Sequence, residues 1–121
     1  MILGRYKANF AALDALLRSA REEQIPVLVY VVPLRRSAKT PYIEHEYAAF
    51  KLRLEELAGK YDVQFANLES LVDDEYWGTM ESTSLGAKNV IDFMHFRSKG
   101  HELLALAIAN LIQPKLKESQ L

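Results

Sequence analysis

The stretch Ile25-Pro-Val-Leu-Val-Tyr-Val-Val-Pro33, followed by Leu34, is the longest apolar run of the chain. It is rich in β-branched residues and lacks polar alternation, which is typical of a strand buried on both faces. Strands of this kind belong to parallel sheets that are covered by helices. Because the run contains prolines and is about half as long as a membrane span, it predicts a buried strand over Pro26 to Pro33.

Amphipathic helices are predicted on both sides of this strand. Before it, apolar residues recur at helical spacing over residues 5–23, with charged residues between them. After it, a basic loop from Leu34 to Tyr42 leads into a second apolar stripe, which predicts a helix from Ile43 to Gly59. Gly59 is expected to stop that helix.

The rest of the chain continues the alternation of strands and helices. Val63 to Leu68 predicts a shorter strand, and Glu69 to Phe96 predicts a long loop with a function or a short helix of its own. The last helix is expected to start at Ser98 as its N-cap and to stop at Pro114. This order predicts a single α/β domain over residues 1–121, with a small parallel sheet and three main helices.

The composition excludes several classes of function. The chain has 121 residues, a net charge of −1 and no cysteine, which rules out disulfides, thiolate zinc sites and a cysteine nucleophile. The basic residues are spread along the chain, so no nucleic-acid partner is expected. Neither an export signal nor a transmembrane segment is expected, and the compartment stays open.

Asp92 and His95 are the best candidates for chemistry. They stand three residues apart in the predicted loop before the last helix. Such spacing lets both side chains emerge from one turn, and a carboxylate beside an imidazole can fix its tautomer and stabilise the charge that arises during base catalysis. On these two residues alone, an aspartate that caps its own backbone beside an unrelated histidine remains the alternative.

The surrounding stretch from Ile91 to Ala105 resembles the closing block of the SGNH (GDSL-type) hydrolases: Asp-x-x-His, a short polar stretch, a glycine and an apolar helix. The preceding elements also resemble the last third of that family, so the resemblance covers nearly the whole chain but about half of a family member. It implies a partial three-layer α/β/α, flavodoxin-like fold. It also implies that Asp92 orients the imidazole and that His95 is the general base of a Ser-His-Asp triad.

Within that family, three short segments look closest to an extracytoplasmic branch. They are Val32-Pro-Leu34, Tyr76-Trp-Gly78 and Asp92-Phe-Met-His95, which resemble alginate acetyltransferase-like proteins and the D-alanine transfer protein of teichoic acid synthesis. The resemblance implies an ester or an acylated carbohydrate as substrate and allows an extracytoplasmic location.

The chain departs from the family pattern at the nucleophile. It has no Gly-Asp-Ser turn and no Gly-x-Asn-Asp block to supply the oxyanion hole. None of its serines is expected at a strand-to-helix turn; they are Ser19, Ser37, Ser70, Ser82, Ser84, Ser98 and Ser119. We therefore expect the triad-completing portion of an SGNH-type esterase or O-acyltransferase, inactive alone. The alternative is a non-catalytic α/β module that acts by binding or by homodimerisation through exposed sheet edges.

Other residues give weaker hypotheses. Arg35 and Arg36 could hold an anionic substrate at the strand end, and Trp77 could cover the site; a solvated loop and loop-anchoring packing are the respective alternatives. A metal-dependent hydrolase that uses Asp92, His95 and His101 is a third hypothesis, although no second histidine shares a helical face with His95 at i, i+4. No cofactor or metal is otherwise expected.

Overall fold

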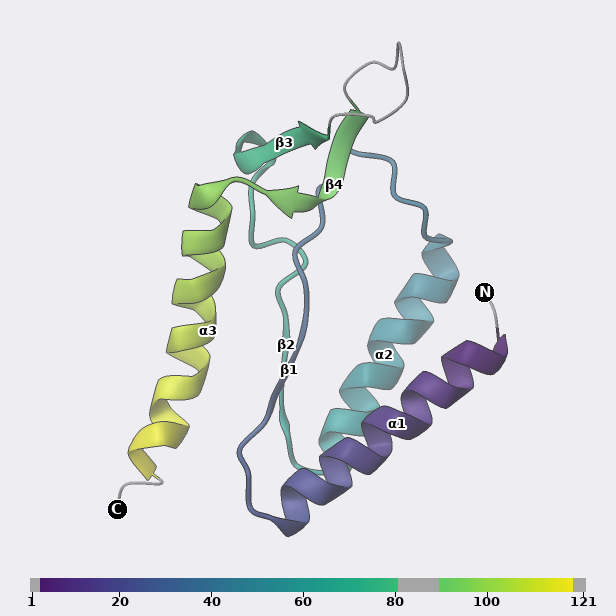
Figure 1. Ribbon diagram of the computed structural model, residues 1–121, viewed down its shortest axis with the longest axis vertical. Helices are drawn as coiled ribbons and strands as arrows, with labels where there is room; N and C mark the ends of the chain where they lie inside the picture. Colours follow the sequence, from purple (N-terminus) through teal and green to yellow (C-terminus); the bar gives the residue numbers. More distant parts are fainter. Residues whose placement is uncertain (1–2, 81–89, 119–121) are drawn as a thin grey trace. The chain divides into compact units, whose positions relative to one another are not determined.

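The computed structural model describes residues 3–80 and 90–118 (Figure 1). In this part of the chain the fold is mixed α/β, with three α-helices, a parallel two-stranded sheet and an antiparallel strand pair. The elements are α1 (Leu3–Glu22), β1 (Leu28–Val31), α2 (Glu44–Lys60), β2 (Gln64–Asn67), the 3-10 helix η1 (Asp74–Tyr76), β3 (Trp77–Met80), β4 (Val90–Phe96) and α3 (Ser98–Glu118).

The chain divides into two compact units. The first comprises Met1–Tyr30 and Tyr42–Ala66, and the second comprises Val31–Pro41 and Asn67–Leu121. The first unit therefore holds α1, α2 and most of the β1–β2 sheet, whereas the second holds η1, β3, β4 and α3. The single domain expected over residues 1–121 stays a prediction.

In the first unit, α1 and α2 pack through their apolar stripes. Phe10 and Leu17 of α1 are buried, and the Phe10 ring meets the edge of Phe50 of α2 with ring centroids 5.8 Å apart. The helix predicted at residues 5–23 and the one predicted at 43–59 are confirmed to within two residues at each end. Local periodicity placed both helices because the apolar residues of each recur on one face. That face is buried at Phe10, Leu17 and Ala20 of α1, whereas the apolar stripe of α2 is half-buried.

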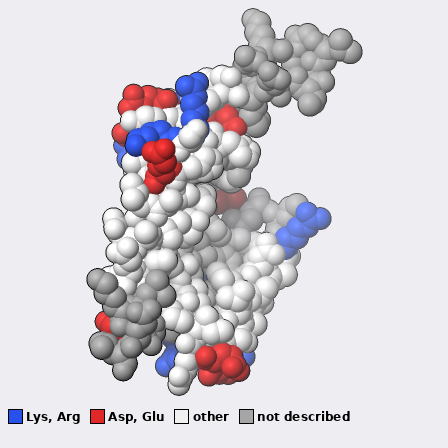
Figure 2. All heavy atoms as spheres, turned by 60° about the vertical axis from the view of Figure 1, so that its left-hand side comes forward, with Lys and Arg blue, Asp and Glu red and all other residues white. Residues whose placement is uncertain are grey.

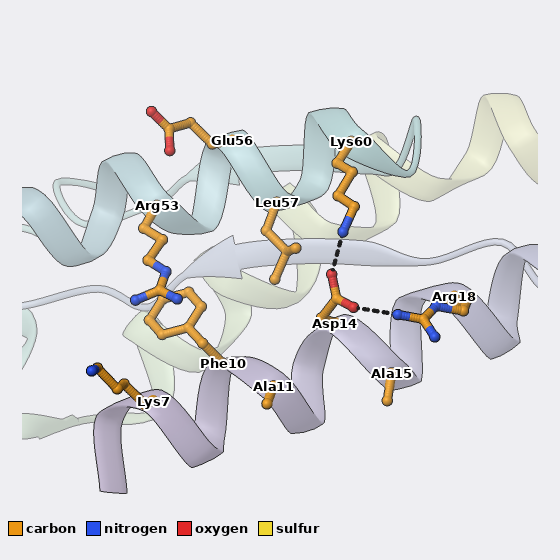
Figure 3. A pocket seen from close by; sticks show the side chains of 10 residues that line it. All are labelled: Lys7, Phe10, Ala11, Asp14, Ala15, Arg18, Arg53, Glu56, Leu57 and Lys60. Atoms are coloured by element: carbon orange, nitrogen blue, oxygen red, sulfur yellow. Dashed lines mark hydrogen bonds and ion pairs between the residues drawn. The ribbon is translucent and has the colours of Figure 1, made fainter. Parts of the chain in front are cut away.

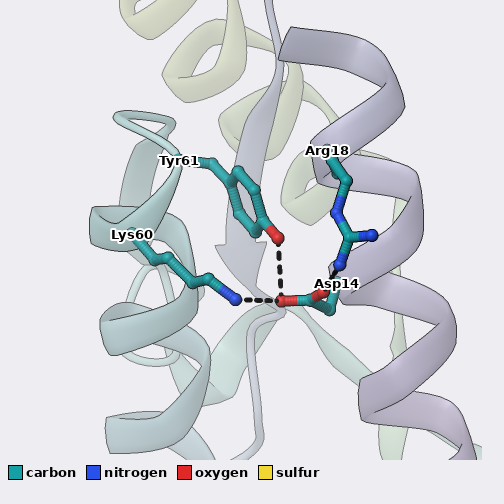
Figure 4. Close-up of polar contacts among 4 residues, drawn as sticks. All are labelled: Asp14, Arg18, Lys60 and Tyr61. Carbon is teal, nitrogen blue, oxygen red and sulfur yellow. Dashed lines mark hydrogen bonds and ion pairs between the residues drawn. The ribbon is translucent and has the colours of Figure 1, made fainter. Parts of the chain in front are cut away.

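A polar cluster joins the same two helices at one end (Figure 4). One carboxylate oxygen of Asp14 accepts hydrogen bonds from Lys60 Nζ at 2.8 Å and from the Tyr61 hydroxyl at 3.0 Å, and the other accepts from Arg18 Nη2 at 2.9 Å. The hydrogen bonds from Lys60 and then Tyr61 hold the pKa of Asp14 below its ordinary value.

Both helices of this unit end in the same way. Gln24 and Asp62 adopt left-handed conformations, with φ of 56° and 55°. After α1, the Gln24 and Ile25 amides donate to the carbonyls of Arg21 and Ala20, and after α2, the amides of Asp62 and Val63 donate to those of Gly59 and Ala58. This bond pattern is the Schellman motif. The expected stop at Gly59 is one residue early: α2 continues to Lys60, and the left-handed residue that ends it is Asp62 instead of the glycine.

The strand predicted over Pro26 to Pro33 is shorter in the structure. β1 covers Leu28–Val31 and pairs with β2, which ends at Asn67. Only Val31 of β1 is buried and its other residues are half-buried, so the expected burial on both faces is wrong for most of the strand. The ladder ends before Val32, which is 51% exposed, and Pro33, which is buried but has no amide to donate. Beyond the two strands, separate hydrogen bonds join the segments that follow them. The Leu68 amide donates to the Val31 carbonyl, and the Leu34 amide donates to the Glu69 carbonyl.

In the second unit, β3 pairs with β4 in an antiparallel ladder that the sequence did not predict. Trp77 is buried at the start of β3, where its indole N–H donates to the Val72 carbonyl at 3.1 Å and its ring meets Phe96 edge to face. The expected loop from Glu69 to Phe96 is thus wrong where β3 and β4 form. The apolar and aromatic residues from Val90 to Phe96 were the signal for β4.

The two ends of α3 also differ from the prediction. The His101 amide donates to the Arg97 carbonyl at 3.2 Å, so Arg97 is the N-cap and Ser98 is the first helical residue. Pro114 lies inside the helix, which continues to Glu118. A proline removes one amide donor, but its φ near −65° is compatible with a helix. No helix in the described ranges is both long enough and apolar enough to cross a bilayer.

Candidate functional site

The candidate site lies on a long, irregular bulge of β4. Trp77 pairs with Phe96 and Thr79 pairs with Ile91, so two steps along β3 face five steps along β4. Residues 92–95 therefore bulge out of the ladder opposite Gly78. Bulges re-aim side chains and release main-chain groups from strand pairing. Here the bulge contains both members of the predicted pair, Asp92 and His95, which lie on strand β4 instead of the expected loop.

Asp92 and His95 contact each other at both ends of the carboxylate. Asp92 Oδ2 lies 2.9 Å from His95 Nδ1, and Asp92 Oδ1 accepts a hydrogen bond from the His95 main-chain amide at 3.0 Å. The Asp92 side chain is 8% exposed, whereas that of His95 is 76% exposed. A buried carboxylate thus holds the ring of an exposed histidine.

This arrangement has a definite chemical consequence. When Asp92 is ionised its carboxylate only accepts hydrogen bonds, so the contact assigns the proton of a neutral imidazole to Nδ1. Nε2 is then the ring nitrogen with a lone pair that can take a proton. The structural alternative, an aspartate that caps its own backbone, is also present, because Asp92 Oδ1 accepts from the His95 amide. One carboxylate performs both tasks.

Arg35 lies against the bulge from the loop after β1. Its Nη1 donates to the main-chain carbonyls of Gly78 at 2.9 Å and Asp92 at 3.4 Å. Its own amide donates to the Phe93 carbonyl at 3.5 Å. From the sequence, Arg35 was expected either to hold an anionic substrate or to lie solvated in its loop. No local pattern indicated that its partners would be carbonyl groups of a bulge more than forty residues away.

The other predicted substrate-binding residues lie in different environments. Arg36 is exposed on the loop, next to Arg35. Trp77 is 3% exposed and packs in the interior of its unit, which favours the alternative of loop-anchoring packing. Their roles toward a substrate stay predictions.

The serines of the chain have mixed positions. Ser37 Oγ accepts a hydrogen bond from Arg35 Nε at 3.1 Å, so it belongs to the network around the bulge. Ser19, Ser70 and Ser98 are exposed. Ser82, Ser84 and Ser119 lie outside the described residues.

His101 packs against an aromatic ring. Its imidazole lies on Phe96 with ring centroids 4.6 Å apart. Across the ranges that the structure describes, no three His, Cys, Asp or Glu side chains are placed to hold a metal ion. The third hypothesis, a metal shared by Asp92, His95 and His101, thus gains no geometric support.

A groove of about 550 Å³ lies between α1 and α2 (Figure 3). Its floor is formed by apolar residues such as Phe10 and Leu57, and the Arg53 guanidinium lies 4.3 Å from the Phe10 ring centroid. The Asp14 carboxylate in this groove is already paired with Lys60 and Arg18. The ion pairs and the cation–π contact therefore stabilise the packing of α1 against α2, and we interpret the groove as part of this helix interface.

The charges on the visible surface are mixed. On the face seen in Figure 2, most of the area is uncharged, and the acidic and basic side chains form small groups instead of a broad patch of one sign.

In the comparisons with known proteins, no family model, curated protein or solved structure matches the chain.

Proposed function

We propose that this chain supplies the general base and its orienting carboxylate to an SGNH-type esterase or O-acyltransferase. His95 is the base and Asp92 is the orienting residue. The observation that carries the proposal is the 2.9 Å contact between His95 Nδ1 and Asp92 Oδ2, made by a buried carboxylate to an exposed imidazole. We also propose that the complete enzyme has a three-layer, flavodoxin-like fold, of which this chain forms a part.

The pair suits acyl transfer from an ester. A serine hydroxyl would attack the acyl carbonyl while His95 Nε2 takes the hydroxyl proton. Asp92 would stabilise the imidazolium that forms, and that imidazolium would return its proton to the departing alcohol. Water would then release the acyl group in an esterase, whereas a carbohydrate hydroxyl would accept it in an acyltransferase.

The serine and the oxyanion-hole donors are proposed to come from a segment outside this sequence. Within the sequence, no Gly-Asp-Ser turn supplies them. A base without a nucleophile and without donors for the oxyanion gives little acyl transfer. We therefore expect this chain alone to be nearly inactive and the longest natural protein that contains it to be active.

The test is hydrolysis of a short-chain p-nitrophenyl ester by this chain and by that longest natural protein, each with a His95→Ala variant. His45→Ala is the matched control, because His45 is an exposed histidine in the first turn of α2. Only the longer protein should be active, and His95→Ala should lower its kcat by about 10³-fold or more while His45→Ala leaves kcat unchanged. An inert longer protein, or full activity of the His95 variant, would contradict the proposal.

Self-association is the second candidate function. The parallel sheet has two strands in the described part of the chain, and Val32 directly after β1 is half exposed. A sheet of two strands is marginal by itself and offers open edges to a second copy. Light scattering after size exclusion, at several protein concentrations, should then show a dimer; a monomer at every concentration would exclude this candidate.

A further inference from the structure

We infer that Arg35 is a positioning residue for the Asp92–His95 pair, because it holds the β4 bulge through main-chain carbonyl groups. Its catalytic meaning rests on the proposed function. Its effect on the His95 ring can be measured without any enzymatic activity. In this role Arg35 binds the protein main chain, whereas the role predicted from sequence was to bind an anionic substrate.

Arg35 contacts main-chain carbonyl groups on both strands of the pair. Nη1 bridges the Gly78 carbonyl on β3 and the Asp92 carbonyl on β4, at 2.9 and 3.4 Å. The Arg35 amide approaches a third carbonyl, that of Phe93, at 3.5 Å. A bulge removes such carbonyls from the regular ladder, and buried carbonyls need a donor from elsewhere. Arg35 supplies that donor to the bulge and to the strand opposite it.

The Arg35 guanidinium is itself held in place. Arg35 Nε donates to Ser37 Oγ at 3.1 Å, and the Ser37 amide donates to Asp74 Oδ1 at 3.4 Å. Nε and Nη1 thus have separate partners, which fixes the plane of the group. A guanidinium offers several donors in a rigid fork, whereas an ammonium is a single point donor on a flexible stem. Lysine would keep the charge of Arg35 but lose this geometry.

The main chain and the side chain of Asp92 have different partners. Arg35 contacts its main-chain carbonyl, whereas the carboxylate contacts the His95 amide and ring. Arg35 therefore fixes where the Asp92 backbone lies, and the backbone fixes where the carboxylate meets the imidazole. Misplacing a catalytic group by about 1 Å can cost about 10²-fold in rate.

The direct test is nitrogen NMR of the His95 imidazole in this chain, which reports the tautomer and the hydrogen-bonded Nδ1 proton. We compare the wild type with Arg35→Gln and Arg35→Lys, and use Arg36→Gln as the control because Arg36 is the exposed neighbour. Both Arg35 variants should lose the Nδ1 proton signal and show mixed tautomers, whereas Arg36→Gln should match the wild type. If Arg35→Gln does not fold, Arg35→Lys decides. A wild-type signal in a folded Arg35 variant would overturn the inference.

A kinetic test separates positioning from substrate binding. In the longest natural protein, Arg35→Lys should lower kcat for a p-nitrophenyl ester by about 10- to 100-fold with little change in KM. A raised KM with an unchanged kcat would overturn the inference in favour of substrate binding. Absence of activity in the wild type would refute the proposed function, and the NMR result would still decide the role of Arg35.

Discussion

Gly100 in α3 and Phe96 at the end of β4 lie so close that a methyl group on Gly100 would stand 2.6 Å from Phe96 Cδ2 and 2.8 Å from Phe96 Cβ. This contact lets α3 begin directly beside the end of the strand that carries Asp92 and His95. Gly100 is buried, and the Phe96 ring is itself held against Trp77. The glycine of the Asp-x-x-His block is therefore required by packing, since any side chain would push the strand and the helix apart.

Gly100→Ala is expected to lower the free energy of unfolding by about 1–3 kcal/mol, because it overpacks a closed contact. Urea unfolding followed by circular dichroism measures this change. Gly59→Ala is the matched control: its Cβ would meet nothing within 4 Å, and it lies inside α2. That control should raise stability by about 0.5–1 kcal/mol. Equal effects of the two substitutions would contradict the packing argument.

Gln24→Gly is expected to stabilise the protein by about 0.5–1 kcal/mol. Gln24 has a φ of 56°, and a residue with a Cβ pays a steric penalty there that glycine avoids, offset in part by the larger entropy of glycine in the unfolded chain. Ser19→Gly, on the exposed side of α1, should destabilise by a similar amount. Thermal unfolding of both variants gives the comparison, and a lower melting temperature for Gln24→Gly would refute the left-handed cap.

Asp14 should make stability depend on pH in the acid range. Hydrogen bonds from Lys60 and Tyr61 lower the pKa of Asp14 in the folded state. Its contribution is therefore complete above the unfolded-state pKa of about 3.9. It is lost as the pH falls through the lower folded-state pKa.

Asp14→Asn tests this because an amide does not titrate. The wild type should be more stable than the variant at pH 6, and the difference should shrink as the pH falls below about 4. Urea unfolding at stepped pH values is the measurement. A difference that stays constant down to pH 2 would show that the Asp14 cluster has no electrostatic role.

Trp77→Phe tests whether this residue serves packing or substrate. The substitution removes the donor to the Val72 carbonyl and should lower the free energy of unfolding by about 1–3 kcal/mol. Under the proposed function, the esterase kinetics of the longest natural protein that contains this chain should change little, because Trp77 is buried. Unchanged stability together with a strongly raised KM would instead support the substrate role predicted from sequence.

Under the proposed function, Asp92→Asn should lower esterase activity more than it lowers the free energy of unfolding. The amide oxygen can still accept from the His95 main chain, but an amide no longer selects the Nδ1-protonated tautomer or stabilises an imidazolium. In the longest natural protein we expect kcat to fall by about 10²- to 10⁴-fold. Asn67→Ala is a control at an exposed polar residue of β2. Full activity of Asp92→Asn would refute the orienting role.

Much of the fold followed from local sequence. The spacing of Phe10, Leu13 and Leu17 predicted α1, and the β-branched run around Val29 predicted β1, because a helix stripe and a strand each leave a periodic trace in neighbouring residues. The pairing of β3 with β4 left a weaker trace, since both strands lie beside polar and acidic segments. Two helix ends were placed too early. Pro114 lies inside α3, which continues to Glu118. α2 continues one residue past Gly59, because the left-handed residue that ends it is Asp62.

The sequence by itself determined which chemical groups are present: a carboxylate and an imidazole three residues apart, a glycine after them and no cysteine. Only the tertiary structure decided that Asp92 is buried, that His95 is exposed and that Arg35 reaches their bulge. The reason is physical. Residue spacing sets what neighbours along one turn can do, whereas burial and bulge geometry depend on segments that meet only after β3 pairs with β4 and the loop after β1 folds against them.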